Sequence, residues 1–212
     1  MRGFLECQAC FLRQALEAAR YVTEDESVQA LAISRVHEAL AEIDYRLPPP
    51  LIARLVYGVV RDTTGVEDPY LAAKKESNEL ALGLYQWAQE KVADSASPLG
   101  VALKLAIAAN VVDYGIGNRF DLRESLENVM TRSLDIDESA RLFDELSQAR
   151  VLLYLGDNSG EIVFDKLLLE KIGGRFPLLK KFFAVRGGPV INDITMDDAD
   201  KVQLGDVAAV IS

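Results

Sequence analysis

The chain has 212 residues, half of them apolar, which is enough to bury a core without disulfides. Its formal net charge of −10 argues against general attraction to nucleic acid or to an anionic membrane, because both depend on an excess of Lys and Arg. No apolar run reaches the roughly 18 residues of a membrane span, and the N-terminus lacks the apolar stretch of a signal peptide, so we expect a cytoplasmic protein.

The chain up to residue 148 has the spacing of amphipathic helices. Apolar residues recur three and four positions apart along about 5–22, 28–43, 51–61, 70–93, 99–111 and 138–148. The triple proline at 48–50 ends the second helix and can open the third, since proline is tolerated in a first helical turn. We predict an α-helical domain over residues 1–148.

The pattern changes at about residue 149. Residues 151–155 and 181–185 form short apolar runs typical of buried parallel strands, and helical spacing over 162–172, stopped by Gly173 and Gly174, separates them. This order is that of a βαβ unit, and a third run over 207–211 reaches the last residue. We predict an α/β protein whose second domain, residues 149–212, is Rossmann-like. No helix follows the third run, so we expect this sheet to be incomplete at its C-terminus.

Polar residues follow the first two predicted strands. Asp157 and Asn158 come after the first strand, and Asn192 and Asp193 after the second, about one βαβ repeat further on. Ligands of open α/β sheets bind beyond the carboxyl ends of the strands. Two carboxylates and a side-chain amide suit a hard cation such as Mg²⁺ or Mn²⁺, with positions left for water and phosphate. The alternative is a helix N-cap with a tight turn at 157–160 and another turn at 192–195.

Cys7 and Cys10 are the only cysteines, and their C-x-x-C spacing suits a second metal site or a redox pair. A zinc site of Cys and His would need two more ligands, whereas His37 is the single histidine. The alternative is that both cysteines are packing residues one turn apart on the first helix. We expect His37 to be an ordinary packing or surface residue.

Four ordered motifs resemble those of a known family. DNSGE at 157–161 and VRGGPVINDITMDDA at 185–199 resemble the two central motifs of the DUF89 family, the damage-control phosphatases related to the ARMT1-like proteins. DPY at 68–70 with Lys74 and Asn78, and NVVDYG at 110–115, resemble motifs of that family's helical domain. The C-x-x-C points to the prokaryotic branch. The resemblance runs over essentially the whole chain.

The resemblance implies a phosphatase that acts on small phosphorylated metabolites such as sugar phosphates, in metabolite damage control. It implies a divalent cofactor, Mn²⁺, Mg²⁺, Co²⁺ or Ni²⁺, with Asp157, Asn158 and Asp193 as ligands. Glu161 and Asn192 would serve the substrate or support the ligands. Asn110 and Asp113 would reach the cleft from the helical side. The family's further strands and a Lys-Gly segment that contributes to phosphate binding have no counterpart here.

The expected reaction is in-line attack of water on phosphorus, with a cation polarising a phosphoryl oxygen. Asp193 and Glu161 are both candidates for removing the proton from the attacking water. Arg186 could bind phosphate oxygens by a forked hydrogen bond or could be an exposed loop residue.

Two other functions stay open. A cofactor-dependent transferase could use the same fold, but no G-x-G-x-x-G follows the first strand and the chain contains no G-x-x-x-x-G-K-[ST]. A non-catalytic module that binds a metal or another ligand is the third possibility. The sequence does not predict an oligomeric state.

Overall fold

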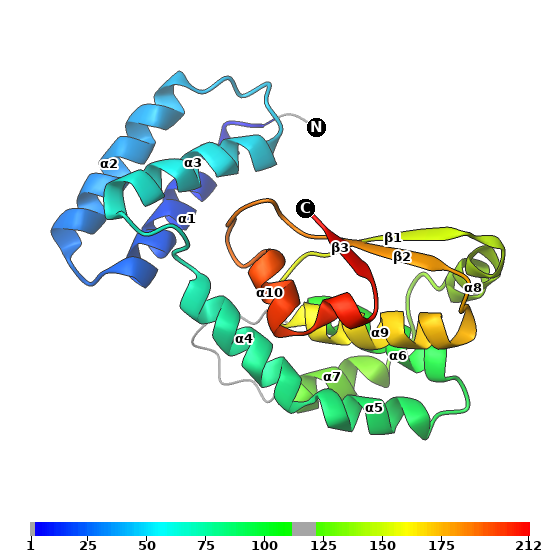
Figure 1. Ribbon diagram of the computed structural model, residues 1–212. Coiled ribbons are helices and arrows are strands. Elements are labelled where there is room, and N and C mark those ends of the chain that lie inside the picture. Colours follow the sequence, from blue (N-terminus) through cyan, green and yellow to red (C-terminus); the bar gives the residue numbers. More distant parts are fainter. Residues whose placement is uncertain (1–2, 112–121) are drawn as a thin grey trace. The chain divides into compact units, whose positions relative to one another are not determined.

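The computed structural model describes residues 3–111 and 122–212, which divide into two compact units (Figure 1). Unit 1 contains the residues up to Ala72 together with Pro189–Ile191, and unit 2 contains Ala73–Gly188 and Asn192–Ser212. The predicted boundary at 148 marks the change from helices to strands. The compact units divide earlier because α5 and α6 pack directly on α9, the helix that covers the sheet.

Unit 1 is built on three helices that pack on one another: α1 (Glu6–Val22), α2 (Glu26–Glu42) and α3 (Pro49–Thr64). The Asp25 carboxylate accepts a hydrogen bond from Ser27 N and caps the start of α2. Pro49 opens α3 as the sequence predicts, and Gly65 ends it in the left-handed conformation (φ 71°). The apolar stripes of the three helices form the core of this unit, which includes Phe11, Leu40 and Val56.

Unit 2 combines helices with a small sheet. Its elements are α4 (Leu71–Gly83), α5 (Tyr85–Ala93), α6 (Pro98–Val111), α7 (Leu122–Met130), α8 (Ser139–Gln148), β1 (Val151–Leu155), α9 (Glu161–Arg175), β2 (Lys180–Ala184), α10 (Met196–Lys201), the 3-10 turn η1 (Leu204–Asp206) and β3 (Ala209–Ile211). None of the helices in the described part of the chain is long and apolar enough to cross a bilayer.

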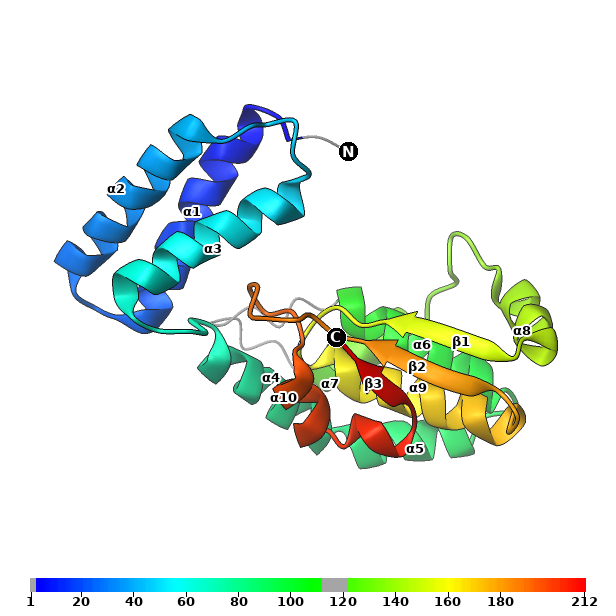
Figure 2. The same cartoon turned by 45° about the horizontal axis from the view of Figure 1, so that its top comes forward.

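The sheet is parallel, with strand order β1-β2-β3 (Figure 2). Leu153 is paired with Phe182, and Phe183 with Val210. This confirms the predicted α/β class and the βαβ order. The prediction that β1 is buried on both faces is wrong for the described residues, because side chains alternate along a strand and Val151, Leu153 and Leu155 are each more than half exposed.

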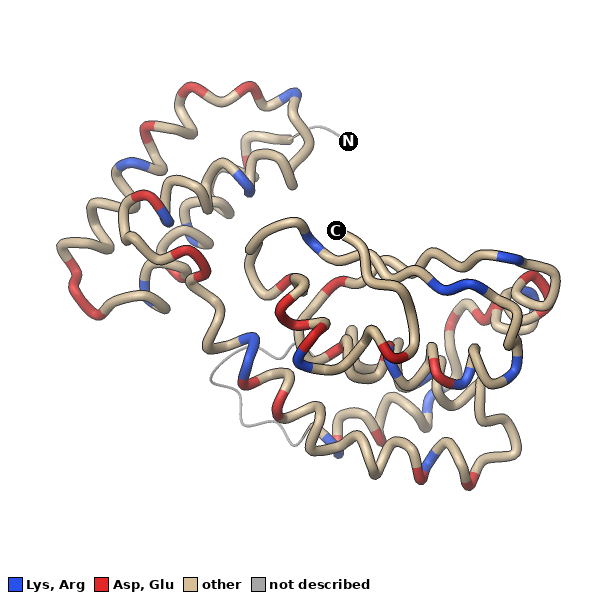
Figure 3. The backbone as a smooth tube through the Cα atoms, viewed as in Figure 1, with Lys and Arg blue, Asp and Glu red and all other residues tan. Residues whose placement is uncertain are grey.

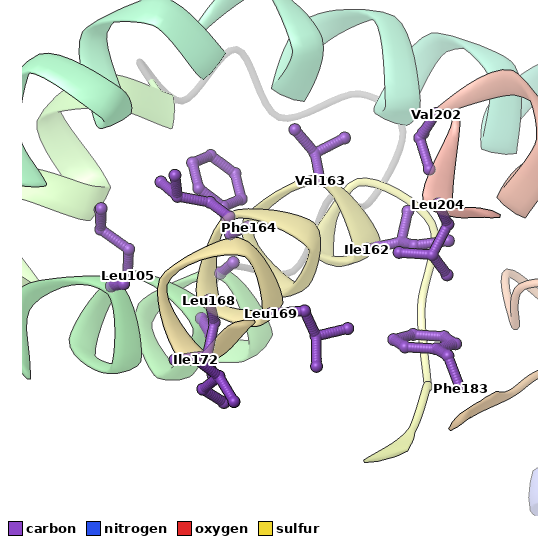
Figure 4. Close-up of a cluster of buried hydrophobic side chains, with 14 of the residues drawn as sticks. Leu105, Ile162, Val163, Phe164, Leu168, Leu169, Ile172, Phe183, Val202 and Leu204 are labelled. Atoms are coloured by element: carbon purple, nitrogen blue, oxygen red, sulfur yellow. The ribbon is translucent and has the colours of Figure 1, made fainter. Parts of the chain in front are cut away.

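The core of unit 2 surrounds α9, which lies between the sheet and α6 (Figures 2 and 4). In Figure 4, Ile162 and Leu169 point toward Phe183 and Leu204, while Phe164 points toward the opposite side of the helix. All five side chains are fully buried. A helix with apolar residues on both sides is stable only when it is covered on both sides, so the sheet and the preceding helices depend on each other.

Several element boundaries differ from those predicted. The helix expected over 70–93 is two helices, α4 and α5, separated at Leu84. Helix α9 continues through Gly173 and Gly174, where the sequence predicts a stop. The absence of a side chain at Gly173 leaves room for the Lys181 ammonium, which donates to the Leu169 carbonyl at 3.0 Å. α7 was not predicted, and the run at 207–211 is a strand only from Ala209.

Candidate active site

Two loops meet beyond the carboxyl ends of β1 and β2. Ile194 N donates to the Asp157 carbonyl at 2.9 Å, and Ser159 N donates to the Asn192 carbonyl at 2.9 Å. Asn158 and Asp193 form an antiparallel bridge. These main-chain bonds place residues 157–159 beside residues 192–194, although about one βαβ repeat separates them in the sequence.

Two glycines permit this close approach. A side chain at Gly156 would collide with Phe183 and Ile194, both fully buried, so only glycine lets β1 run on into the loop at this point. Gly160 precedes the first residue of α9 with φ 83°, a conformation that other residues rarely adopt. The turn therefore brings Asn158 to the N-terminus of α9, where its carbonyl accepts from Ile162 N at 3.4 Å.

Negative charge is concentrated where the loops meet. Asp193 is 13% exposed, and its carboxylate forms a 2.5 Å ion pair with Arg186, which is 53% exposed. Burial raises the pKa of Asp193, the bond to Arg186 opposes this, and the charge of Asp157 adds to the rise. Asp157 itself is exposed. Figure 3 shows that acidic residues are also closely spaced along α10, the helix that follows this loop.

Glu161, the first residue of α9, is buried. Asn110 Nδ2 donates to Glu161 Oε2 at 2.9 Å. Burial raises the pKa of Glu161 and the charge of Asp157 adds to it, while the bonds from Asn110 and Asn158 lower it. The side-chain oxygen of Asn158 can act as an acceptor or as a metal ligand.

The side chains at the meeting point include the oxygen ligands that a hard cation prefers. The charge of Asp157 adds to the raised pKa of Asp193, and a bound cation would oppose that effect. Within residues 3–111 and 122–212, no three side chains of His, Cys, Asp or Glu are grouped to hold an ion. A cation here would therefore rest on two carboxylates and the Asn158 oxygen, with water or phosphate completing the oxygen ligands.

The structure brings most of the predicted site residues together in unit 2. Those at or directly bonded to the two loops are Asp157, Asn158, Glu161, Arg186, Asn192, Asp193 and Asn110. Asp113 lies outside the described residues. Cys7 and Cys10 lie on α1 of unit 1 as free thiols, each partly exposed, and Phe4 N donates to Cys7 Sγ at 3.4 Å.

Sequence reasoning assigned no chemistry to Asn78 and Asp198, which are bonded to the same loops, or to Lys74, which pairs with Asp198. Asn78 Oδ1 accepts from Gly160 N at 2.7 Å, and Lys74 Nζ lies 2.9 Å from Asp198 Oδ2. The signal was present, because all three fall within or beside the motifs quoted above. Residue type alone does not predict whether a polar residue on a helix is buried or exposed.

The sequence also matches a known family along nearly its whole length. Residues 4–209 match the damage-control phosphatase ARMT1-like domain. The chain belongs to the ARMT1-like damage-control phosphatase family. A damage-control phosphatase of Pyrococcus horikoshii is 32% identical, over 100% of this chain and 73% of the relative. A damage-control phosphatase of Archaeoglobus fulgidus is 34% identical, over 95% of this chain and 70% of the relative.

A solved structure of the ARMT1-like family has the same fold. The crystal structure of a DUF89 family protein from Pyrococcus horikoshii superposes with a TM-score of 0.90 at 30% identity, covering 100% of this chain and 74% of that one. The DUF89 resemblance predicted from the four motifs is therefore confirmed. The assignment to a prokaryotic branch through Cys7 and Cys10 stays a prediction.

Proposed function

We propose that this protein is a divalent-metal-dependent phosphomonoester hydrolase acting on small phosphorylated metabolites such as sugar phosphates, in metabolite damage control. The observation that carries the proposal is the pairing of the two acidic loops at the carboxyl edge of the sheet, where Asn158 is bridged to Asp193 and Ile194 N donates to the Asp157 carbonyl. Family membership and the names of the two archaeal relatives support phosphatase chemistry.

Asp157, Asn158 and Asp193 would hold the cation, which we expect to be Mn²⁺, Mg²⁺, Co²⁺ or Ni²⁺. When bound, it supplies Lewis-acid polarisation of a phosphoryl oxygen and compensates phosphate charge. Arg186 is exposed enough to exchange its ion pair with Asp193 for a phosphate oxygen, and its planar guanidinium can donate two parallel hydrogen bonds. Asn110 and Asn192, and Asp113 beyond the described residues, would bind the rest of the substrate.

Of the two candidates for proton removal, we favour Glu161. Its carboxylate accepts from Asn110, and it begins the helix that follows the loop with two of the proposed cation ligands. Asp193 is already engaged as a proposed ligand and by Arg186. In this arrangement, Glu161 would accept the proton of the water that attacks phosphorus, and Asn110 would keep the accepting oxygen in place.

Metal-dependent phosphate release tests the proposal. The protein is treated with EDTA, dialysed, and assayed against a panel of sugar phosphates with each of the four cations. Release should be negligible after EDTA and should return with at least one cation. Cation binding without any release would favour the non-catalytic binding module, and release unaffected by EDTA would contradict the metal requirement. A transferase would need a second, acceptor substrate before phosphate left the donor.

Two predictions do not concern this site. A second metal or a redox role for Cys7 and Cys10 stays a prediction, and so does the cytoplasmic location.

A further inference from the structure

A buried ion pair lies beneath the two acidic loops. Lys74 of α4 and Asp198 of α10 are each 1% exposed, and Lys74 Nζ is 2.9 Å from Asp198 Oδ2. Removing two charges from water is unfavourable, and the loss is recovered only when the geometry and the hydrogen bonding of the pair are good. A pair of this kind is therefore weak support for stability alone, and its contacts indicate another role.

Asn78, one turn after Lys74 on α4, links this ion pair to the first loop. Its Oδ1 accepts from Gly160 N at 2.7 Å, and its Nδ2 donates to Asp198 Oδ1 at 3.1 Å. The amide is 2% exposed. A side chain that accepts at one end and donates at the other can make both bonds, whereas a carboxylate or an aliphatic group cannot.

Asp198 links the same pair to the second loop. Its Oδ2 accepts from Thr195 N at 3.0 Å and from Thr195 Oγ1 at 2.9 Å, and Thr195 is the N-cap of α10, two residues after Asp193. Burial raises the pKa of Asp198, but the bonds from Lys74 and Thr195 outweigh it and hold the pKa below its usual value. Every oxygen of this carboxylate is thus engaged.

We infer that Lys74, Asn78 and Asp198 are positioning residues that fix the spacing between the loop at 157–160 and the loop at 192–195. Gly160 is held through Asn78, Thr195 is held through Asp198, and the two holding side chains are bonded to each other. The statement that these loops bind a cation rests on the proposed function. The continuous chain of contacts from Gly160 to Thr195 is independent of that proposal.

The spacing of the two loops would determine whether one cation can bind to both. Divalent cations bind oxygen ligands within a narrow range of distances, so two carboxylates on separate loops share an ion only when the loops keep one spacing. Residues that orient ligands without touching the metal commonly change metal affinity by about 10–100-fold when they are substituted. Loss of the Asn78 bridge should therefore weaken cation binding more than it weakens the fold.

A double-mutant cycle with Asn78→Asp and Asp198→Asn tests the bridge. Asn78→Asp alone replaces the amide that donates to Asp198 at 3.1 Å with a second carboxylate, so that two acceptors face each other. Asp198→Asn alone removes the carboxylate that pairs with the buried Lys74. In the double variant, the amide introduced at position 198 can donate to the carboxylate introduced at position 78, which still accepts from Gly160 N. The total charge is retained and the polarity of one hydrogen bond is reversed, while the carboxylate that compensates Lys74 moves from position 198 to position 78.

Three measurements are made on each variant: exchange of the Gly160 amide hydrogen by NMR, Mn²⁺ affinity by calorimetry, and thermal unfolding. The single variants should expose the Gly160 amide and bind Mn²⁺ about 10–100-fold more weakly, and the double variant should recover both properties. Tyr85→Phe is the matched control, because it removes a partly buried bond to Glu170 elsewhere on α9 and should lower stability without changing either property. If a single variant does not fold, Asn78→Ser takes its place in the same comparison.

Single variants that fold and keep wild-type Gly160 exchange and Mn²⁺ affinity would overturn the inference. So would a double variant no better than the worse single variant. If the wild-type protein binds no Mn²⁺, the proposed metal site fails, and Gly160 exchange across the cycle still decides whether the three residues position the loop.

Discussion

Substitution of Asp193 by Asn tests whether this residue is a metal ligand or only a turn residue. Asn keeps the volume of Asp and is equally accepted in turns, but it removes a negative oxygen ligand. We expect Asp193→Asn to lower metal-dependent phosphate release by more than about 100-fold while thermal unfolding changes little. The measurement is phosphate release against metal concentration. Asp197→Asn, an exposed acid on the first turn of α10, should keep full activity. Wild-type turnover by Asp193→Asn at limiting metal would exclude the ligand role.

Asp165 carries a prediction about stability and pH. It is 1% exposed, Tyr154 Oη donates to its Oδ1 at 2.6 Å, and its Oδ2 has no hydrogen-bond partner among the described residues. Burial raises the pKa of Asp165 well above its usual value, with further rises from Glu161 and Asp157. The folded state therefore binds this proton more tightly than the unfolded state does. Its contribution to stability is lost as pH rises through the folded pKa.

Asp165→Asn removes that pH dependence, because an amide cannot ionise. Above the folded pKa, the variant should unfold with a free energy about 1–3 kcal/mol larger than wild type, and the gain should shrink toward about pH 4. Urea unfolding at a series of pH values measures it, with Asp144→Asn, at an exposed position, as the control. A gain of equal size at every pH would mean that ionisation of Asp165 is not the cause.

At the scale of secondary-structure elements, two neighbouring glycines of α9 should respond in opposite ways to alanine. A Cβ at Gly174 meets nothing within 4 Å, so Gly174→Ala should stabilise the helix by about 0.5–1 kcal/mol. A Cβ at Gly173 would displace the Lys181 ammonium from the Leu169 carbonyl, so Gly173→Ala should gain less or lose stability. Chemical unfolding of both variants compares them, and equal gains would show that Lys181 moves away without cost.

At the scale of the whole molecule, a cation that binds only the folded site must stabilise the protein. Mn²⁺ at 100 times its dissociation constant should add about 2.7 kcal/mol to the free energy of unfolding. Thermal unfolding over a series of Mn²⁺ concentrations should give a melting temperature that rises with the logarithm of concentration and returns to its starting value with EDTA. The same rise in Asp193→Asn would place the bound Mn²⁺ at another site.

The sequence by itself determined the order of strand, helix and strand, because the periods of a helix and of a strand are local properties that neighbouring side chains impose. It also identified the acidic residues at the strand ends, since parallel strands must align their carboxyl ends. The sequence-based prediction was wrong where tertiary packing outweighed a local preference. Gly173 and Gly174 read as a helix stop, but covering α9 on both sides stabilises the helix through them.

Only the tertiary structure decided which polar residues serve the loops. Asn78 and Asp198 lie 120 positions apart, and no periodicity or composition relates them. The role of these residues depends on burial. A Lys, an Asn and an Asp on a helix surface are hydrated, whereas the same three residues buried away from water need hydrogen-bond and charge partners in the protein. Burial is set by packing between elements distant in the chain. The sequence therefore predicted the acids at the strand ends, and the fold showed which buried side chains are bonded to their loops.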